Sequence, residues 1–279
     1  MIYSPIKICA LFLVATIFSD MPAPAQNLDL VGLTLLRAQT TNLDGSGIRV
    51  AQPEGQSGGS TNFEVNPFTV GVASNLLTYI STDGVATNYP NDVGGESWHA
   101  HDVAANFYGP YLGLATNVAH VDNLDADYFI NNYIVSNLTV LGDLVVNQSF
   151  TFGPLDATNQ QAVDSAYDDY TETYGTFFVS AACNADISLR VCAPGTAYNC
   201  ISVGACRDGN YYNSIGPTID NGRCKPDITA PAGATSFSTP QVSGAVALLM
   251  QAAGAVTAGE IPILRLTSGP SKHCSLTAR

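Results

Sequence analysis

The 279-residue sequence has few charged residues, and few of these are positive. Only 12% of the residues are charged, with 10 lysines and arginines against 23 aspartates and glutamates, which gives a formal net charge of −13. Because a protein that holds nucleic-acid phosphates needs clusters of cations, no nucleic-acid partner is expected. Hydrophobic residues make up 46% of the chain. That fraction excludes an intrinsically disordered protein.

Long hydrophobic runs are missing everywhere except at the N-terminus. Residues 8–18 are almost entirely apolar, follow Lys7 and form a run that is short for a membrane-spanning helix. Ala23 and Ala25 then offer small side chains for cleavage before Gln26. The pattern predicts a signal peptide over residues 1–25, with an uncleaved N-terminal anchor as the alternative. The mature chain is expected to be secreted or periplasmic and to have no membrane partner; the sequence carries no signal for an oligomeric state.

Paired metal-ligand motifs are also absent. The sequence has no CxxC pair, which argues against a zinc knuckle. Only four histidines are present. His99 and His101 stand two residues apart, and on a helix side chains with that spacing point in different directions. We therefore predict no metal site. Once Cys9 leaves with the signal peptide, six cysteines remain, for which an oxidising compartment favours disulfides of unknown pairing: Cys183, Cys192, Cys200, Cys206, Cys224 and Cys274.

Apolar strands alternate with helical segments along the chain. Predicted strands cover residues 48–51, 144–146, 176–182 and 200–205. Predicted helices cover residues 28–39, 99–108 with Ser97 as cap, 159–174, and an apolar segment that opens at Ser236 and includes 242–253. Pro53 is expected to stop the first strand and to begin an exposed loop over residues 53–62.

This alternation predicts an α/β fold, with a doubly wound, mostly parallel sheet and helices on both faces. In such sheets, active sites collect at the carboxyl ends of the strands. One domain over residues 26–255 is the simplest division. Residues 256–279 form an irregular tail that suggests a truncated or aberrant C-terminus.

Four side chains that carry candidate chemistry each stand at a strand end or a helix start. They are Glu54, His99, Asn184 and Ser236. Each also has an ordinary interpretation: a loop carboxylate, a packed or surface histidine, a turn-forming asparagine and a helix-capping serine.

The order and spacing of these residues resemble those of the subtilisin-like serine peptidases. Residues 225–233 read KPDITAPAG and residues 234–240 read ATSFSTP, close to the KPDIxAPG and GTSxAxP blocks of that family. Val103 and Ala104 align His99 with the family's histidine block, and residues 181–184, AACN, resemble its AAGN. The resemblance also includes residues 45–54 and 201–205, and it runs from about residue 30 to about residue 255.

The resemblance implies a role for each candidate. Ser236 would be the nucleophile, His99 the general base and Glu54 the acid that orients it. Asn184 would form the oxyanion hole with the backbone N–H of Ser236. Ser149 and Phe150 would hold a protein or peptide substrate by strand addition. The resemblance thus implies a serine endopeptidase.

Two departures from the family pattern leave an alternative open. Glu54 stands where the family has aspartate, and Cys183 stands where it has glycine. Asp102 and Glu96 are rival acids near His99, although neither is well placed on a helix. The alternative is a catalytically impaired protein on the same scaffold, either a peptide-binding or structural protein or a truncated product.

No cofactor is assigned. Calcium is common in the resembled family, but the spacing of Asp122, Asp125 and Asp127 does not match a calcium-binding loop, so no calcium site is assigned.

Overall fold

The computed structural model describes residues 25–59, 61–136, 139–153, 155–184, 190–207, 210–211, 216–218 and 223–254. The predicted signal peptide, apart from Ala25, and the predicted tail lie outside these residues. Within them, no helix combines the length and the apolar character needed to cross a membrane.

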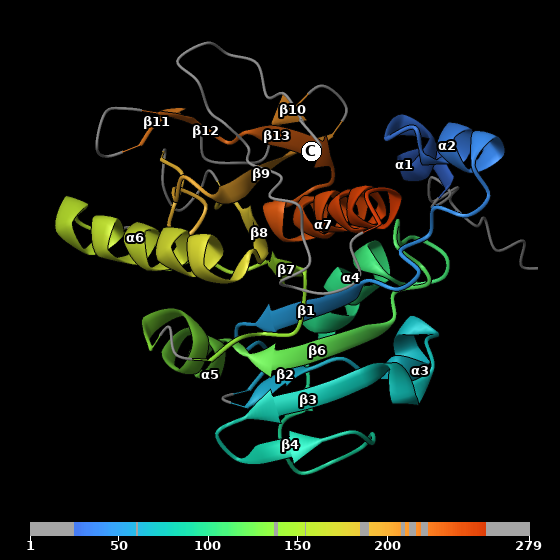
Figure 1. The fold of residues 1–279 in the computed structure, drawn as a ribbon, viewed down its shortest axis with the longest axis horizontal. Helices are drawn as coiled ribbons and strands as arrows, with labels where there is room; N and C mark the ends of the chain where they lie inside the picture. Colours follow the sequence, from blue (N-terminus) through green and yellow to red (C-terminus); the bar gives the residue numbers. More distant parts are fainter. Residues whose placement is uncertain are drawn as a thin grey trace, which may run out of the picture.

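A sheet of nine strands forms the centre of the molecule (Figure 1). Its strands are β1 (Arg49–Glu54), β3 (Leu77–Ser81), β4 (Gly84–Ala86), β6 (His120–Asp125), β7 (Val145–Gln148), β8 (Phe177–Ala181), β9 (Cys200–Arg207), β10 (Asn210–Tyr211) and β13 (Ile228–Pro231). Their order is β10-β9-β8-β7-β1-β6-β3-β4, and β13 also pairs with β9. Only β4 and β10 pair antiparallel, so the predicted mostly parallel sheet is confirmed.

Two further strand pairs lie outside this sheet. They are β2 (Asn62–Glu64) with β5 (Gly95–Glu96), and β11 (Gly216–Pro217) with β12 (Cys224–Lys225). The helices are α1 (Ala25–Leu30), α2 (Leu33–Gln39), α3 (Pro67–Val70), α4 (Trp98–Phe107), α5 (Ala126–Phe129), α6 (Ala157–Tyr174) and α7 (Thr235–Ala252), with a 3-10 turn η1 (Ser74–Leu76) and a π-helical turn η2 (Ile130–Val135).

Helices cover both faces of the sheet, as the sequence predicts. Val50 and Val145 belong to a core cluster that includes residues of α4 and α7. The next residue on each strand, Ala51 and Val146, belongs to a second cluster with residues of α5 and α6. Because successive side chains on a strand point to opposite faces, these two clusters are the two sides of the sheet. Figure 1 shows α7 and α6 on these two sides.

The prediction that Pro53 stops the first strand is wrong. β1 continues through Pro53 to Glu54, and both side chains are buried. The strand stays paired with β6 up to Glu54, whereas its register with β7 ends at Ala51. Proline lacks only its N–H, so it is tolerated where one side of a strand has no partner. The expected exposed loop is therefore shorter than residues 53–62.

Two other local expectations need correction. The predicted helix 28–39 is broken into α1 and α2 at Gly32, which has a left-handed φ of 77°. The predicted disulfides are not formed in the described part of the chain: Cys192, Cys200, Cys206 and Cys224 are thiols. Cys274 lies outside the described residues.

Two chain segments that matter for the site meet at the centre of the sheet. From β1 the chain moves to β3 and then β6 on one side, and only afterwards to β7, β8 and β9 on the other. The carboxyl ends of β1 and β7 therefore meet where the winding reverses direction, which is where open α/β sheets bind their ligands. Glu54 is the last residue of β1, and Ser149 follows the last residue of β7.

Candidate active site

Glu54 and His99 meet at the end of β1. Nδ1 of His99 lies 2.8 Å from Oε2 of Glu54, a hydrogen bond between residues 45 positions apart in the sequence. His99 stands in the first turn of α4, which the side chain of Ser97 caps by accepting the N–H of Ala100, as predicted. The side chain of Glu54 is 1% exposed and that of His99 is 17% exposed. The carboxylate thus holds the ring from the protein interior.

The pKa of His99 reports this pairing. Burial of the ring lowers the pKa, but the hydrogen bond and the charge of Glu54, together with the charge of Asp102, raise it above the ordinary value of 6.5. The net direction is upward because a buried carboxylate at hydrogen-bond distance favours the protonated ring. An orienting acid in a catalytic triad has this same electrostatic effect.

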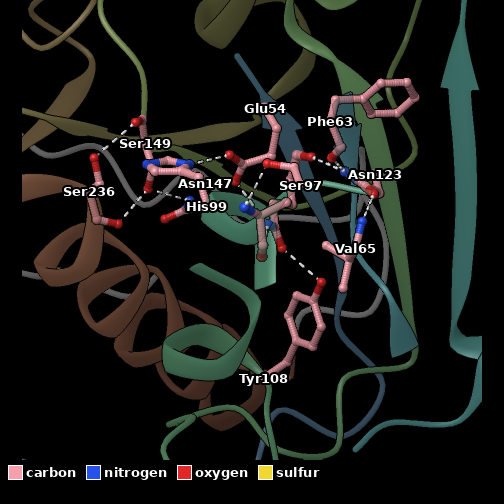
Figure 2. Close-up of polar contacts among 12 residues, drawn as sticks. Glu54, Phe63, Val65, Ser97, His99, Tyr108, Asn123, Asn147, Ser149 and Ser236 are labelled. Atoms are coloured by element: carbon pink, nitrogen blue, oxygen red, sulfur yellow. Dashed lines mark hydrogen bonds and ion pairs between the residues drawn. The ribbon is translucent and has the colours of Figure 1, made fainter. Parts of the chain in front are cut away.

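Ser236 lies inside the first turn of α7 and does not cap it. The N-cap position is Ala234, so the interpretation of Ser236 as a capping serine is wrong. The N–H of Ser236 has no acceptor among the described residues, as expected for the first turn of a helix. The ring of Phe237 lies 5.8 Å from the ring of His99, which brings the start of α7 against the histidine. Figure 2 shows the His99 ring between Glu54 and the Ser149–Ser236 pair.

Ser149 and Ser236 exchange two hydrogen bonds. Oγ of Ser149 donates to the carbonyl of Ser236 at 2.8 Å, and Oγ of Ser236 donates to the carbonyl of Ser149 at 3.3 Å. Asn147 donates to Oγ of Ser149 and accepts from Ser243 on α7. The end of β7 is therefore fixed to α7. In this structure the hydroxyl of Ser236 bonds to Ser149, and no hydrogen bond joins it to His99 within the described residues.

Asn184 stands beside the start of α7. Its Oδ1 lies 3.2 Å from both the N–H and the hydroxyl of Thr235, each of which donates to it. Because the amide oxygen is the acceptor there, the amide group that an oxyanion would use is the NH₂. Cys183, just before Asn184, has a φ of 74° and is the one non-glycine residue with positive φ among those described. This left-handed conformation accounts for a glycine at the corresponding place in the family pattern.

Phe150 and the two rival acids complete the set of predicted residues. Phe150 follows Ser149 beyond the end of β7 and is partly buried. Glu96 pairs with His101 at 3.4 Å and accepts from Tyr89, so it does not bond to His99. Asp102 acts on His99 through its charge alone.

The described residues do not gather the side chains that most often ligate a metal ion. They contain no group of three or more His, Cys, Asp or Glu side chains that could hold one. Among the acids considered for calcium, Asp122 bonds to Arg49, and Asp125 caps α5 by accepting the N–H of Tyr128. We therefore derive no step through calcium.

Sequence reasoning missed the partners behind Glu54. Nε2 of Gln52 donates to Oε1 of Glu54 at 2.8 Å, and Oε1 of Gln52 accepts from the hydroxyl of Tyr108 at 2.7 Å. Gln52 stands two residues before Glu54 on β1, so both side chains point to the same face of the sheet. That alternation was a usable signal, but the contribution of Tyr108 was not visible without the fold.

A known protein family matches most of the chain. The subtilase family, peptidase family S8, matches residues 41–268. The chain belongs to the subtilase family. The match passes residue 255, and the predicted domain boundary there stays a prediction.

Among subtilases, the chain is similar to pyrolysin from Pyrococcus furiosus, with 32% identity over 149 residues. The match covers 36% of this chain and 10% of pyrolysin, so the chain matches only about a tenth of that relative's length. Two solved structures share its fold at 20% identity: a cold-adapted subtilisin-like serine proteinase and the prenylagaramide maturation protease PagA. The first has a TM-score of 0.54 and covers 77% of this chain and 80% of its own; for the second, the values are 0.51, 79% and 80%.

Proposed function

We propose that this subtilase is a secreted serine endopeptidase that cleaves protein or peptide substrates through an acyl-enzyme on Ser236. The observation that carries the proposal is the 2.8 Å pair of His99 and Glu54 beside the first turn of α7. Three segments distant in sequence contribute to it, and an acid, a base and a nucleophile in this arrangement are what acyl transfer requires. The signal-peptide pattern in residues 1–25 supports secretion.

In the proposed first step, the hydroxyl of Ser236 turns from the carbonyl of Ser149 toward Nε2 of His99. His99 takes the hydroxyl proton as the serine oxygen bonds to the substrate carbonyl carbon. The C–N bond then breaks, and His99 returns the proton to the leaving amine. In the second step, His99 takes a proton from water as the water oxygen bonds to the acyl carbon; the bond from that carbon to Oγ of Ser236 then breaks, the acid is released and His99 returns the proton to Oγ. Glu54 keeps its hydrogen bond to Nδ1 throughout and stabilises the protonated ring.

The oxyanion of the tetrahedral intermediate would accept two hydrogen bonds. The donors proposed are the NH₂ of Asn184 and the N–H of Ser236, supported by the partial positive charge at the start of α7. Ser149 and Phe150 would align the substrate backbone beside the nucleophile. The proposed steps assign no role to a metal or other cofactor.

One observation favours a second candidate, a peptide-binding protein without turnover on the same scaffold. The hydroxyl of Ser236 bonds to Ser149 and not to His99. Catalytic hydrogen bonds often form only when substrate binds, so the endopeptidase remains the preferred function.

Turnover of a casein-type substrate separates the two candidates. We expect the wild type to cleave it and Ser236→Ala to lose cleavage. The matched control is Ser238→Ala on the same helix turn, where the hydroxyl donates only to the carbonyl of Thr235; this variant should keep cleavage. Peptide binding without cleavage, unchanged in Ser236→Ala, would establish the second candidate instead.

A further inference from the structure

Glu54 is held on two sides, and only one of them is His99. Oε2 faces Nδ1 of His99, while Oε1 accepts from Nε2 of Gln52 at 2.8 Å. Gln52 is completely buried and Glu54 nearly so. A buried carboxylate needs hydrogen-bond donors, and here each oxygen has its own. The donor on Oε1 therefore determines which oxygen remains for the histidine.

The orientation of the Gln52 amide follows from its partners. Nε2 donates to two groups that can only accept, Oε1 of Glu54 and the carbonyl of Ala100 at 3.0 Å. Oε1 faces the hydroxyl of Tyr108, which must be the donor because an amide oxygen carries no proton. If the amide were flipped, its oxygen would face two other acceptors, Oε1 of Glu54 and the carbonyl of Ala100. The direction of this chain of hydrogen bonds, from Tyr108 through Gln52 to Glu54, is thus determined.

The same amide also connects the acid to the helix that carries the base. Ala100 directly follows His99 in the first turn of α4, and Tyr108 is the C-cap residue of that helix. Gln52 thus contacts Glu54 and both ends of α4 (Figure 2 draws the hydrogen bond of the Tyr108 hydroxyl as a dashed line). Asn123 on β6 also holds the backbone of β1 at this point, because its side chain donates to the carbonyl of Gln52.

We propose that Gln52, held by Tyr108, is a positioning residue that allows glutamate to serve as the orienting acid of this site. A glutamate has one more methylene than the aspartate of the family pattern and one more torsion to fix. Gln52 restrains that torsion by holding Oε1, so that Oε2 stays at hydrogen-bond distance from His99. The inference rests on the proposed function of His99 as general base.

The titratable groups that act on this pair and on Tyr108 come from α4, its C-cap and β3, whose Tyr79 helps to raise the pKa of Tyr108. Asp102 raises the pKa of His99 through its charge, and the charge of Glu54 acts on His101 and Tyr108. Burial raises the pKa of Tyr108 well above 10, so its hydroxyl stays neutral while His99 titrates. The variants below keep Asp102 and His101 unchanged.

The test uses Gln52→Met combined with Tyr108→Phe, which removes the amide and its donor with little change in volume. Tyr108→Phe alone is the milder variant, should the double variant fail to fold. The matched control is Tyr79→Phe, a buried tyrosine on the same face whose hydroxyl donates to the carbonyl of Val65 and not to the side chain of Gln52 or Glu54. Active sites are counted by fluorophosphonate titration, so that kcat refers to folded enzyme.

We expect the double variant to lose about tenfold or more in kcat per active site, with KM nearly unchanged. Without a donor on Oε1 the carboxylate becomes a stronger acceptor, so the acid limb of kcat/KM should move to higher pH. Tyr108→Phe should move both values in the same directions by less, and Tyr79→Phe should move neither. An unchanged kcat and acid limb in both network variants would overturn the proposal.

Proton NMR of the His99 Nδ1–H resonance gives a readout that does not depend on turnover. In the wild type we expect a slowly exchanging downfield signal, and in the double variant a shifted or broadened one. If the wild type neither cleaves nor labels but its resonance responds to Gln52, the proposed function fails while the positioning role stands. If the wild type is active and the resonance does not respond, the positioning role fails alone.

Discussion

At the level of single residues, the proposed catalysis depends on what the extra methylene of Glu54 does. The carboxylate bonds to His99 and Gln52 at once, each at 2.8 Å. A shorter acid cannot keep both contacts without movement of the backbone, and a neutral one cannot stabilise a protonated ring. Two substitutions separate length from charge.

Glu54→Asp should lower kcat by about tenfold, because the acid withdraws from at least one partner. Glu54→Gln should lower it by about 10³–10⁴-fold, because the amide carries no charge and permits the wrong histidine tautomer. Steady-state kinetics with active-site titration measures both. Equal losses of kcat in the two variants would contradict the distinction between the length of the acid and its charge.

The pKa of His99 predicts the pH dependence of the reaction. The base must be neutral to accept a proton, so kcat/KM should rise with pH through a pKa above 6.5. In Glu54→Gln the acid limb should move to lower pH, because burial still lowers the pKa of His99 while the carboxylate that raises it is gone. An acid limb that stays in place would show that His99 does not titrate against Glu54.

The same shift has a consequence for stability, with a definite sign. A histidine whose pKa is raised on folding stabilises the folded state most below the unfolded pKa, and this contribution is lost as the pH rises through the folded pKa. The stabilisation from the His99–Glu54 pair should therefore be largest below about pH 6.5, and Glu54→Gln should be relatively less destabilised at higher pH.

At the level of secondary-structure elements, the turn after β8 contains a conformational conflict. Cys183 adopts a φ of 74°, which costs a non-glycine residue about 1 kcal/mol or more. Its side chain is buried and forms a hydrogen bond with the thiol of Cys192. Cys183→Gly relieves the backbone, whereas the matched Cys183→Ala keeps the strain. Both variants lose the thiol contact, so their difference reports the strain alone.

We expect the free energy of unfolding of Cys183→Gly to be about 1 kcal/mol higher than that of Cys183→Ala. The glycine variant should also keep its turnover. Urea unfolding followed by circular dichroism measures the first quantity. A glycine variant less stable than the alanine variant would mean that the turn is not strained as described.

The short strand β2 contains a buried acid that should respond to pH. Burial raises the pKa of Glu64 to about 7, against smaller opposing effects of hydrogen bonds from Asn91 and the backbone of Gly94. Because the folded pKa lies above the unfolded value of 4.5, stability should fall as the pH rises through that interval. Glu64→Gln should lose less thermal stability than wild type between about pH 5 and about pH 8.

The exposed acid Asp83 provides the control for this experiment. Asp83→Asn should follow the wild-type dependence of the unfolding temperature on pH. Parallel curves for wild type and Glu64→Gln would show that Glu64 is ionised at no cost in the folded protein.

At the level of the whole molecule, the end of α7 is tied to the turn before β1. Oε1 of Gln251 accepts the N–H groups of Asp44 and Gly45 at 2.9 and 2.8 Å, and its Nε2 donates to the carbonyl of Asn42. These bonds join residues more than 200 positions apart. They fix α7, which carries Ser236, against the turn that leads into β1, which ends at Glu54.

Gln251→Ala should lower the free energy of unfolding by about 1–2 kcal/mol, because it removes these bonds and leaves two backbone donors without a partner. Urea denaturation measures the change. Leu249→Ala, at a neighbouring exposed position, is the control and should be close to neutral. A Gln251→Ala variant as stable as this control would show that the tie contributes nothing.

The sequence predicted much of the sheet and its main helices and missed several strands, among them one that is rich in polar residues. The strands β7, β8 and β9 and the helices α4, α6 and α7 lie within a few residues of their predicted positions. β6 was missed because it buries polar residues whose partners are far away in sequence. Asn123 is an example, since its amide bonds to the carbonyls of Gln52 and Phe63 and to the N–H of Val65.

The candidate site divides in a similar way. The motifs predicted Glu54, His99, Asn184 and Ser236, because nucleophile chemistry restricts which residues can stand at those places. Gln52 was not predicted, because a glutamine on a strand becomes meaningful only when a donor and a carbonyl from α4 are brought to it. Its role depends on tertiary packing, which one sequence does not display.

Covalent labelling of Ser236 tests the central claim most directly. The full chain is treated with a fluorophosphonate probe, and the modified peptide is identified by mass spectrometry. We expect one adduct on Ser236, absent in Ser236→Ala, formed much more slowly in His99→Ala and retained in Ser238→Ala. A folded wild-type protein that acquires no adduct on Ser236 would contradict the claim.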